Sequence, residues 1–237
     1  MALAAVNRKM GRVVMAEVVD VRARVLAANE EAAAKLRKGF AESGALVLNL
    51  ISSPGSGKTT LLEATVRTLG GRLRLAGIEG DIATERDADR LRALGIPAVQ
   101  ILTGGACHLD ARQVRKVMDE AHFPGVDILF IENVGNLICP TSYDLGEDFK
   151  VALLSVAEGD DKPFKYPAIF ARAEVTVVTK VDLLPHVSFD VAAVRGQLAS
   201  LNPAGEVVLT SARTCEGIPE WCALLEQRLA AKRRARA

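Results

Sequence analysis

The chain has 237 residues, of which 49% are hydrophobic and 25% are charged, and its formal net charge is +1. This composition is typical of a globular protein, and the near-neutral charge excludes the strong field that would predict binding to nucleic acid or to a membrane surface. Apolar runs are too short to cross a bilayer and charged residues interrupt the N-terminus before a secretory signal could form, so we expect a cytoplasmic protein with no membrane or nucleic-acid partner.

The first predicted element is a helix over residues 16–40, where Val, Leu and Ala recur among charged residues until Gly39 and Gly44 end the pattern. We assign residues 1–44 to an N-terminal helical extension that packs on the outside of the core. Apolar strands then alternate with helices to the end of the sequence, without a linker or an internal repeat. Residues 45–237 are therefore predicted to form one domain.

The alternating elements indicate an α/β fold. Strands are expected at 46–51, 73–78, 98–102, 127–131, 151–156, 175–178 and 206–209, and helices at 58–69, 85–94, 109–121, 189–201 and 218–229. Several strands are apolar at consecutive positions, which indicates that helices cover both faces of the sheet. The prediction is a doubly wound, mostly parallel sheet of about seven strands, which binds ligands at the carboxyl ends of its strands.

A phosphate-binding loop follows the first strand and opens the next helix. Residues 52–59 read S-S-P-G-S-G-K-T, the pattern of a P-loop except that Ser52 stands at the first glycine position. The glycines let backbone N–H groups face the phosphates, the lysine places its charge on the β- and γ-phosphates, and the threonine offers its hydroxyl to Mg²⁺. The predicted nucleotide ligands in this loop are Gly55, Ser56, Gly57, Lys58, Thr59 and Thr60.

Two acidic residues, Asp81 and Glu132, end core strands at the edge where ligands are expected. Carboxylates at this edge can hold Mg²⁺ beside the phosphates, and Glu132 begins a Glu-x-x-Gly sequence with the form of the D-x-x-G switch of GTPases. We predict Thr59, Asp81 and Glu132 as magnesium ligands, and Lys58, Asp81 and Glu132 as catalytic residues. Asp81 could instead belong to the cap of the following helix.

Two sequences later in the chain predict guanine as the base. Residues 179–182 read T-K-V-D and resemble the N-K-x-D motif, whose aspartate accepts hydrogen bonds from the N1–H and the exocyclic amine of guanine. Adenine lacks this pair of donors and would leave the carboxylate unpaired, which argues against an ATP-dependent small-molecule kinase. Residues 209–213 resemble the loop that closes over the base, so the predicted base ligands are Lys180, Asp182, Ser211, Ala212 and Arg213.

Soft metal ligands occur in two loops, with Cys107 and His108 after the third strand and Cys139 seven positions after Glu132. Cysteine thiolate and imidazole bind Zn²⁺ and Ni²⁺ well. Neighbouring Cys and His side chains do not easily close around one ion, and three ligands leave the site incomplete without water or a second subunit. On these residues alone, a buried thiol beside a hydrogen-bonded imidazole is the default interpretation.

Five segments, read in order, make the chain similar to the HypB-type nickel-insertion GTPases: SSPGSGKTT, EGDIAT, GGACHLDA, IENVGNLICP and YDLGE. The resemblance covers roughly residues 30–230 and implies a P-loop GTPase domain over residues 45–237 that forms a GTP-dependent homodimer. It also implies that Cys107, His108 and Cys139 form a shared Ni²⁺ or Zn²⁺ site at the dimer interface, near the switch regions. The implied partners are a HypA-like zinc metallochaperone and the precursor of the [NiFe]-hydrogenase large subunit.

The resemblance leaves alternatives open. Some HypB proteins carry an N-terminal cysteine motif or a histidine-rich store, whereas residues 1–30 contain no Cys or His, so neither feature is expected here. One alternative is a UreG-like urease GTPase, in which a Cys-Pro-His motif would replace the directly joined Cys107-His108. Another is a metal-delivery protein that uses GTP only as a dimerisation switch. The sequence defines neither the ion nor the residue that orients the attacking water, and we expect slow hydrolysis.

The remaining candidates are assigned to structure. Cys215 and Cys222 are expected to be buried thiols, Trp221 to pack the final helix, and His122 and His186 to be solvated. The basic tail over residues 232–236 is expected to be a solvated helix end, where positive charge suits the helix dipole.

Overall fold

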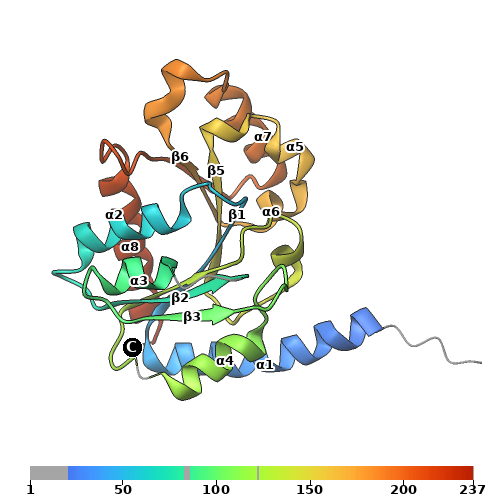
Figure 1. Cartoon of the computed structure of the whole chain (residues 1–237), viewed down its shortest axis with the longest axis vertical. Coiled ribbons are helices and arrows are strands. Elements are labelled where there is room, and N and C mark those ends of the chain that lie inside the picture. Colours follow the sequence, from blue (N-terminus) through green and yellow to red (C-terminus); the bar gives the residue numbers. More distant parts are fainter. Residues whose placement is uncertain (1–20, 83–85, 122, 237) are drawn as a thin grey trace, which may run out of the picture.

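The computed structural model describes residues 21–82, 86–121 and 123–236. Seven strands, all parallel, form one sheet in the order β3-β2-β4-β1-β5-β6-β7 (Figure 1). This confirms the predicted doubly wound α/β fold. The strands are β1 (Leu46–Ser52), β2 (Leu75–Asp81), β3 (Ala98–Leu102), β4 (Ile128–Glu132), β5 (Phe149–Ser155), β6 (Val175–Thr179) and β7 (Glu206–Leu209).

The helices lie before, between and after these strands. They are α1 (Val21–Ser43), α2 (Lys58–Leu69), α3 (Arg86–Arg92), α4 (Ala111–Glu120), α5 (Lys162–Lys165), α6 (Pro167–Arg172), α7 (Val191–Leu201) and α8 (Ile218–Arg236). Short 3-10 helices are η1 (Cys139–Ser142), η2 (Val156–Glu158) and η3 (Val181–His186). In the described part of the chain, no helix combines the length and the apolar character that crossing a bilayer requires.

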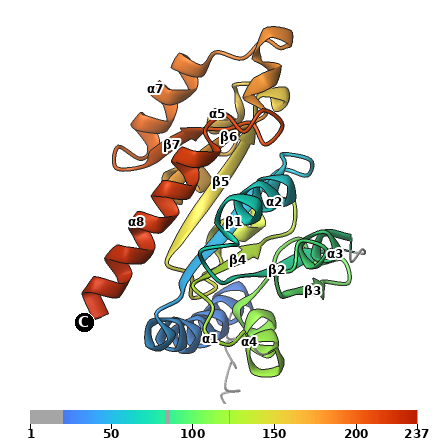
Figure 2. The ribbon, with the colours of Figure 1, turned by 90° about the vertical axis from the view of Figure 1, so that its left-hand side faces the viewer.

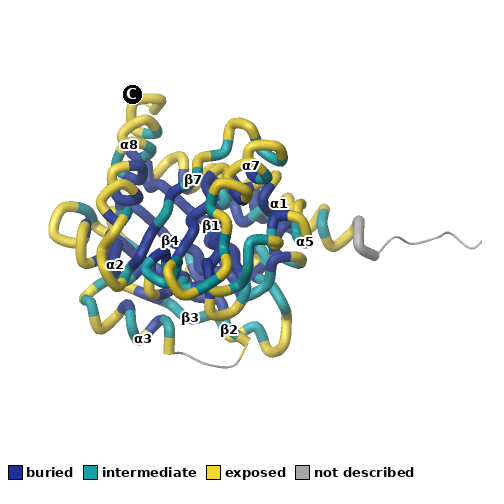
Figure 3. The backbone as a smooth tube through the Cα atoms, turned by 90° about the horizontal axis from the view of Figure 1, so that it is seen from above, coloured by how far each residue is buried: buried dark blue, intermediate teal, exposed yellow. Residues whose placement is uncertain are grey.

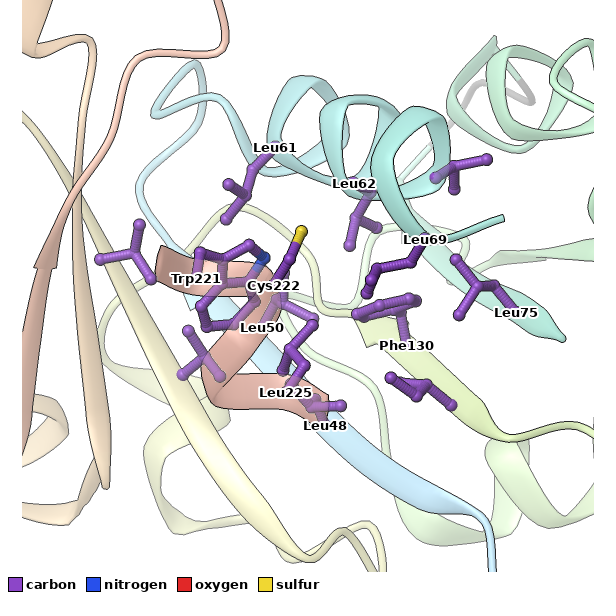
Figure 4. Close-up of a cluster of buried hydrophobic side chains, with 14 of the residues drawn as sticks. Leu48, Leu50, Leu61, Leu62, Leu69, Leu75, Phe130, Trp221, Cys222 and Leu225 are labelled. Atoms are coloured by element: carbon purple, nitrogen blue, oxygen red, sulfur yellow. The ribbon is translucent and has the colours of Figure 1, made fainter. Parts of the chain in front are cut away.

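Helices cover both faces of the sheet because successive strand residues point in opposite directions. On β1, Leu48 and Leu50 pack with α2, α3 and α8, which face the viewer in Figure 2. Figure 4 shows this cluster, in which Trp221 and Leu225 of α8 meet the leucines of α2 over β1 and β4. On the opposite face, Val47 packs with α1 and α4, and Ile51 packs with α6 and α7.

Charged side chains attach the final helix, α8, to the end of the sheet where β1, β4 and β5 begin. Lys232 donates to Asp148 and to the Ala45 carbonyl, and Arg233 pairs with Asp127. The indole N–H of Trp221 donates to Thr65 Oγ1 at 3.0 Å, so α8 is also fixed to α2. The expectation of a solvated basic tail is therefore wrong for Lys232, whose side chain is only 17% exposed, whereas Arg233 is exposed as expected although it also pairs with a carboxylate.

Several element boundaries differ from the predicted ones. The second strand runs to residue 81 rather than 78, and α8 continues to residue 236 rather than 229. The helices α5 and α6 were not predicted, because each is short and begins near a proline. Of the helix predicted at 16–40, residues 16–20 lie outside the described part of the chain, and α1 continues to Ser43.

The parallel strands bring their carboxyl ends to one edge of the sheet. The strand order reverses around β1, which lies between β4 and β5, and ligands of doubly wound sheets bind at such a point. Seen from above, the buried strands run through the centre and exposed loops surround them (Figure 3). The predicted site residues lie at the ends of β1, β2, β3, β4, β6 and β7 or in the segments that follow these strands.

Candidate nucleotide and metal sites

The loop between β1 and α2 has the backbone shape that phosphate binding requires. Gly55 and Gly57 have φ angles of +76° and +96°, in the left-handed region that glycine adopts without strain. A pocket of about 460 Å³ opens above this loop, and its lining includes Lys58, Asp81 and Glu132. The N-terminus of α2 points its free N–H groups toward that pocket, as an anion site needs.

Lys58 lies inside the pocket, with only 7% of its residue surface exposed. Its ammonium group donates to Ser52 Oγ at 3.0 Å and is 3.9 Å from Glu132 Oε1. The serine that replaces the first glycine of the motif thus accepts a hydrogen bond from the lysine. Ser52 is fully buried, so its hydroxyl is held in place, donating in turn to the Ser53 carbonyl.

Two of the predicted magnesium ligands face each other. The hydroxyl of Thr59 donates to Glu132, with 3.0 and 3.1 Å from Oγ1 to the two carboxylate oxygens. Adjacent oxygen ligands around an octahedral Mg²⁺ are about 2.9 Å apart, so these residues fit the ion. Burial raises the pKa of Glu132, while the Lys58 ammonium opposes that shift. Asp81 lines the same pocket from the end of β2, whereas Thr84, the neighbour in its predicted cap, lies outside the described residues.

A second buried carboxyl, Glu79, was missed by the sequence analysis. It pairs in register with Glu132 across β2 and β4 and is 1% exposed. Neither carboxyl oxygen has a hydrogen-bond partner in the described part of the chain, and burial together with the adjacent Glu132 raises the pKa of Glu79 well above its ordinary value. The pair thus favours a neutral Glu79 and a charged Glu132 beside Lys58. The sequence does contain a signal for Glu79, because it lies two positions before Asp81 and the side chains of both residues therefore point to the same face of β2.

A second pocket, of about 290 Å³, continues from the first. Its lining includes Asp182, Ala212 and Arg213, and Gly57, Thr60 and Lys180 line both pockets. Asp182 Oδ1 accepts a hydrogen bond from Ser211 Oγ at 2.6 Å, so the side chains of the two predicted base motifs touch. Most of the predicted phosphate and base ligands therefore line one continuous surface, whereas Ser56 and Ser211 are fully buried and line neither pocket.

The T-K-V-D segment is fixed to the phosphate-binding loop. Thr179 Oγ1 donates to the Ser56 carbonyl at 2.6 Å, and Lys180 Nζ donates to the Gly55 carbonyl at 2.7 Å. Threonine at the position of the motif's asparagine thus still connects this segment to the loop. Lys180 has φ of 60°, a left-handed conformation that costs free energy for a non-glycine residue and is typical of functional sites.

Cys107, His108 and Cys139 converge between two loops. Their ligand atoms all lie within 4.8 Å of one another, and Cys107 Sγ is 3.5 Å from His108 Nδ1. In a tetrahedral site with ordinary metal–sulfur and metal–nitrogen bonds, such ligand atoms are about 3.5 Å apart. The expectation that neighbouring Cys and His side chains do not close around one ion is therefore wrong. Each residue is partly exposed, so an ion or a further ligand could reach the group.

The surroundings of this group suit a metal. Burial lowers the pKa of His108, although Asp110 opposes the shift, and a neutral imidazole is the form that binds metal. The His108 ring lies on the ring of Tyr143, with 3.9 Å between centroids. The hydrogen bond to Cys139 raises the pKa of the Cys107 thiol, and burial adds to the shift. The donor set fits a borderline-soft divalent ion.

The other thiols and imidazoles lie apart from this group. Cys222 is buried as predicted, and burial raises its pKa to about 11. Cys215 is exposed, in the loop after the base motif, so the prediction that it is buried is wrong. His186 is exposed as predicted, and His122 lies outside the described residues.

Comparison with known proteins gives a consistent result. The family model described as CobW/HypB/UreG, nucleotide-binding domain, matches residues 46–209. The hydrogenase maturation factor HypB of Azotobacter chroococcum mcd 1 is 49% identical over 218 residues, which cover 92% of this chain and 72% of that protein. HypB from Helicobacter pylori, solved in complex with nickel, has a TM-score of 0.81 at 39% identity and covers 86% of this chain and 96% of its own. HypB from Archaeoglobus fulgidus has a TM-score of 0.81 at 38% identity, and the match covers 86% of this chain and 99% of that one.

Proposed function

The chain belongs to the CobW/HypB/UreG family and, within it, to the HypB hydrogenase maturation factors, and from this membership we propose that it is a metal-regulated GTPase that assists nickel insertion into [NiFe]-hydrogenase. In this proposal residues 45–237 are the GTPase domain, residues 1–44 are a helical extension, and the protein works in the cytoplasm. The observation that carries the proposal is the pairing, in one chain, of a continuous nucleotide pocket with a converging Cys-His-Cys group.

Hydrolysis is proposed to rest on charge and position. The Lys58 ammonium, which donates to Ser52 in this structure, would turn toward the β- and γ-phosphates when a nucleotide binds. Thr59, Asp81 and Glu132 would hold Mg²⁺, which would supply positive charge against the charge that develops on the phosphates. Among the described residues that line the pocket we assign none as the group that orients the attacking water, in keeping with slow turnover.

Guanine recognition is proposed for the second pocket. Asp182 would accept from the base, and the Ser211 hydroxyl, which bonds to Asp182 Oδ1, would hold that carboxylate at the correct angle. Ala212 and Arg213 would close over the base, while the Lys180 stem packs on it.

The metal group is proposed to be completed by a second copy of the chain. Cys107, His108 and Cys139 supply three ligands, one fewer than a closed tetrahedral site uses. A GTP-dependent homodimer would place two such groups together, and hydrolysis would loosen them and release the ion. A HypA-like zinc metallochaperone and the hydrogenase large-subunit precursor are the proposed partners, with Ni²⁺ or Zn²⁺ at the site.

Lys58→Ala tests the nucleotide half of the proposal. Losing a charge-assisted hydrogen bond to phosphate should weaken GTP binding about tenfold to a hundredfold and abolish phosphate release. Lys38→Ala, at a lysine whose side chain is 80% exposed, is the matched control and should behave as the wild type. Normal binding and hydrolysis by the Lys58 variant would contradict the proposal, and GTP-dependent dimerisation without phosphate release would favour a delivery protein that uses GTP only as a switch.

Cys107→Ala tests the metal half. We expect the wild type to bind Ni²⁺ or Zn²⁺ in a fixed ratio per subunit, with and without a GTP analogue, and the variant to lose that metal. Cys215→Ala removes an exposed thiol away from the group and should keep the wild-type stoichiometry. Equal metal content in all three proteins, measured after gel filtration, would remove the Cys-His-Cys group from the proposal.

A further inference from the structure

Asn133 joins the nucleotide pocket to a buried polar network. It follows Glu132 at the end of β4, lines the phosphate pocket and is 1% exposed. Its Oδ1 accepts hydrogen bonds from the backbone N–H groups of Leu109 and Val134, each at 3.0 Å. Its Nδ2 donates to Asn49 Oδ1 at 3.2 Å. Both ends of the amide are therefore engaged in buried hydrogen bonds.

The first connection runs from Asn133 to the residue after His108. Leu109 is fully buried, and its side chain lies so close to Gly80 that a Cβ on that glycine would be 2.7 Å from it. Gly80 itself lines the phosphate pocket. The backbone next to His108 is thus held in two ways: the Leu109 N–H donates to Asn133 after β4, and the Leu109 side chain packs against Gly80 near the end of β2.

The second connection reaches the other side of the same imidazole. Asn49 Nδ2 donates to Glu147 Oε1 at 3.2 Å, and Glu147 Oε2 accepts from the Leu145 N–H at 2.6 Å. These bonds hold the loop that carries Tyr143, whose ring lies on His108. The side chains of Asn49 and Glu147 are buried, so this path has little freedom to rearrange.

We propose that Asn133 is the positioning residue that transmits nucleotide occupancy at Glu132 to the metal ligand His108. Because Asn133 is the next residue after Glu132, a shift of the Glu132 backbone that brings its carboxylate toward Mg²⁺ would move the Asn133 amide as well. The Leu109 N–H and the Asn49–Glu147 path must follow, or a buried hydrogen bond breaks. This inference rests on the proposed function, since it needs a nucleotide at one end and a metal at the other.

The test is the coupling between the two ligands rather than the affinity for either. Zn²⁺ dissociation constants are measured by chelator competition, without nucleotide and with a saturating non-hydrolysable GTP analogue. In the wild type we expect the analogue to change the Zn²⁺ dissociation constant by about fivefold or more, the usual range for linked sites. In Asn133→Ala we expect the ratio of the two Zn²⁺ dissociation constants to fall to about one, measured at an analogue concentration that saturates this variant.

Asn29→Ala is the matched control. Asn29 is also a buried asparagine, and it connects the segment after His108 to the loop that carries Tyr143. It accepts from the Ala111 N–H at 2.8 Å and donates to the Asp144 carbonyl at 2.8 Å. Unlike Asn133, it comes from α1 and is not among the residues that line the phosphate pocket. This variant should keep the wild-type ratio. Circular dichroism checks folding, and Asn133→Ser, too short to span both partners, replaces the alanine variant if that one unfolds.

The outcomes separate the two proposals. A wild-type ratio retained by the Asn133 variant overturns the inference and leaves the proposed function standing. Equal loss of the ratio in the Asn29 and Asn133 variants also overturns it, because general loosening of the loops would then explain the effect. A ratio of one in the wild type overturns the proposed metal regulation and the inference with it.

Discussion

In the proposed guanine site, base selection would depend on the carboxylate of Asp182, whose orientation is fixed by Ser211. Ser211 is fully buried and its hydroxyl donates to Asp182 Oδ1, while the same Ser211 oxygen accepts from the Thr214 N–H at 3.1 Å. The remaining acceptor capacity of the carboxylate faces the pocket that Ala212 and Arg213 line. A group with only acceptors selects a base edge with only donors.

Asp182→Asn should therefore change base preference rather than abolish nucleotide binding. The amide presents a donor where the carboxylate presented an acceptor, so GTP should bind at least about tenfold more weakly. Xanthosine triphosphate, which carries a carbonyl in place of the exocyclic amine of guanine, should gain affinity. Competition with a fluorescent nucleotide measures both constants, and an unchanged preference for GTP over xanthosine triphosphate would contradict the assignment. Asp190→Asn, at the N-cap of α7, is a control at an aspartate outside the pocket residues.

Individual residues were predictable where a motif fixes the backbone. The loop around Lys58 is in this class, because glycine spacing and the following helix fix where the ammonium can go. Glu79 was missed because the predicted strand ended one residue before it, and only pairing with β4 shows it beside Glu132. The convergence of Cys107 and His108 was not predictable either, because the rotamers of neighbouring side chains depend on contacts such as Tyr143.

At the scale of elements, the position of α8 depends on a carboxylate at the amino end of the sheet. Asp127 accepts from the Arg74 N–H at 2.7 Å and pairs with Arg233 of α8. Burial alone would raise the pKa of Asp127, but the Arg74 amide and the guanidinium groups of Arg233 and Arg74 outweigh burial and lower it. A lowered pKa in the folded state means that the charged form stabilises the fold above the ordinary carboxyl pKa.

Asp127→Asn should lower the free energy of unfolding by about 1–2 kcal/mol at pH 7, because the charge-assisted bonds to α8 are lost. The difference from the wild type should shrink as pH falls below the ordinary pKa of about 3.8 and through the lower value of the folded state. Urea denaturation at a series of pH values measures this difference in the free energy of unfolding. Asp119→Asn, on an exposed helical ion pair, should change stability by less than about 0.5 kcal/mol. A loss that is independent of pH would contradict the charge-based account.

Elements with a clear period and a capping signal were predicted well. The bounds of α2, β3 and β7 agree with the prediction, and α4 begins after Asp110, which forms a capping box with Gln113. The short helices α5 and α6 have too few turns for an apolar period to appear, and α8 was predicted too short because its last turns are held by ion pairs rather than by apolar contacts. The strand order is set by packing between distant segments and is not contained in any local pattern.

At the scale of the whole molecule, the single tryptophan of the sequence reports on the core, and it is not among the residues that line the two nucleotide pockets. The sequence has one Trp, and Trp221 is fully buried between α8 and α2. The helix α2 also begins at Lys58 in the phosphate pocket, so one element links the pocket to this core. Binding at the carboxyl edge should therefore stabilise the core as one unit.

With a GTP analogue at 100 times its dissociation constant, the free energy of unfolding should rise by about 2.7 kcal/mol, as linkage to the folded state requires. Trp221 fluorescence during urea denaturation follows the transition. Lys58→Ala should remove the gain because it removes binding, whereas Lys38→Ala should keep it. A midpoint that does not respond to the nucleotide in the wild type would show that the analogue does not bind preferentially to the folded protein.

The stretch from Glu132 to Cys139 begins at the floor of one pocket and ends at the sulfur of the other site, only seven positions later in the sequence. One inserted residue can lengthen a chain by about 3.5 Å, which is enough to separate a thiolate from an ion. Gly135 is also tightly packed, because a Cβ there would lie 2.9 Å from Pro54, so this position cannot carry a side chain. Evolution can therefore exchange side chains along this stretch except at Gly135, but it has almost no room for insertions or deletions, and functional descendants of this sequence should keep its length unchanged.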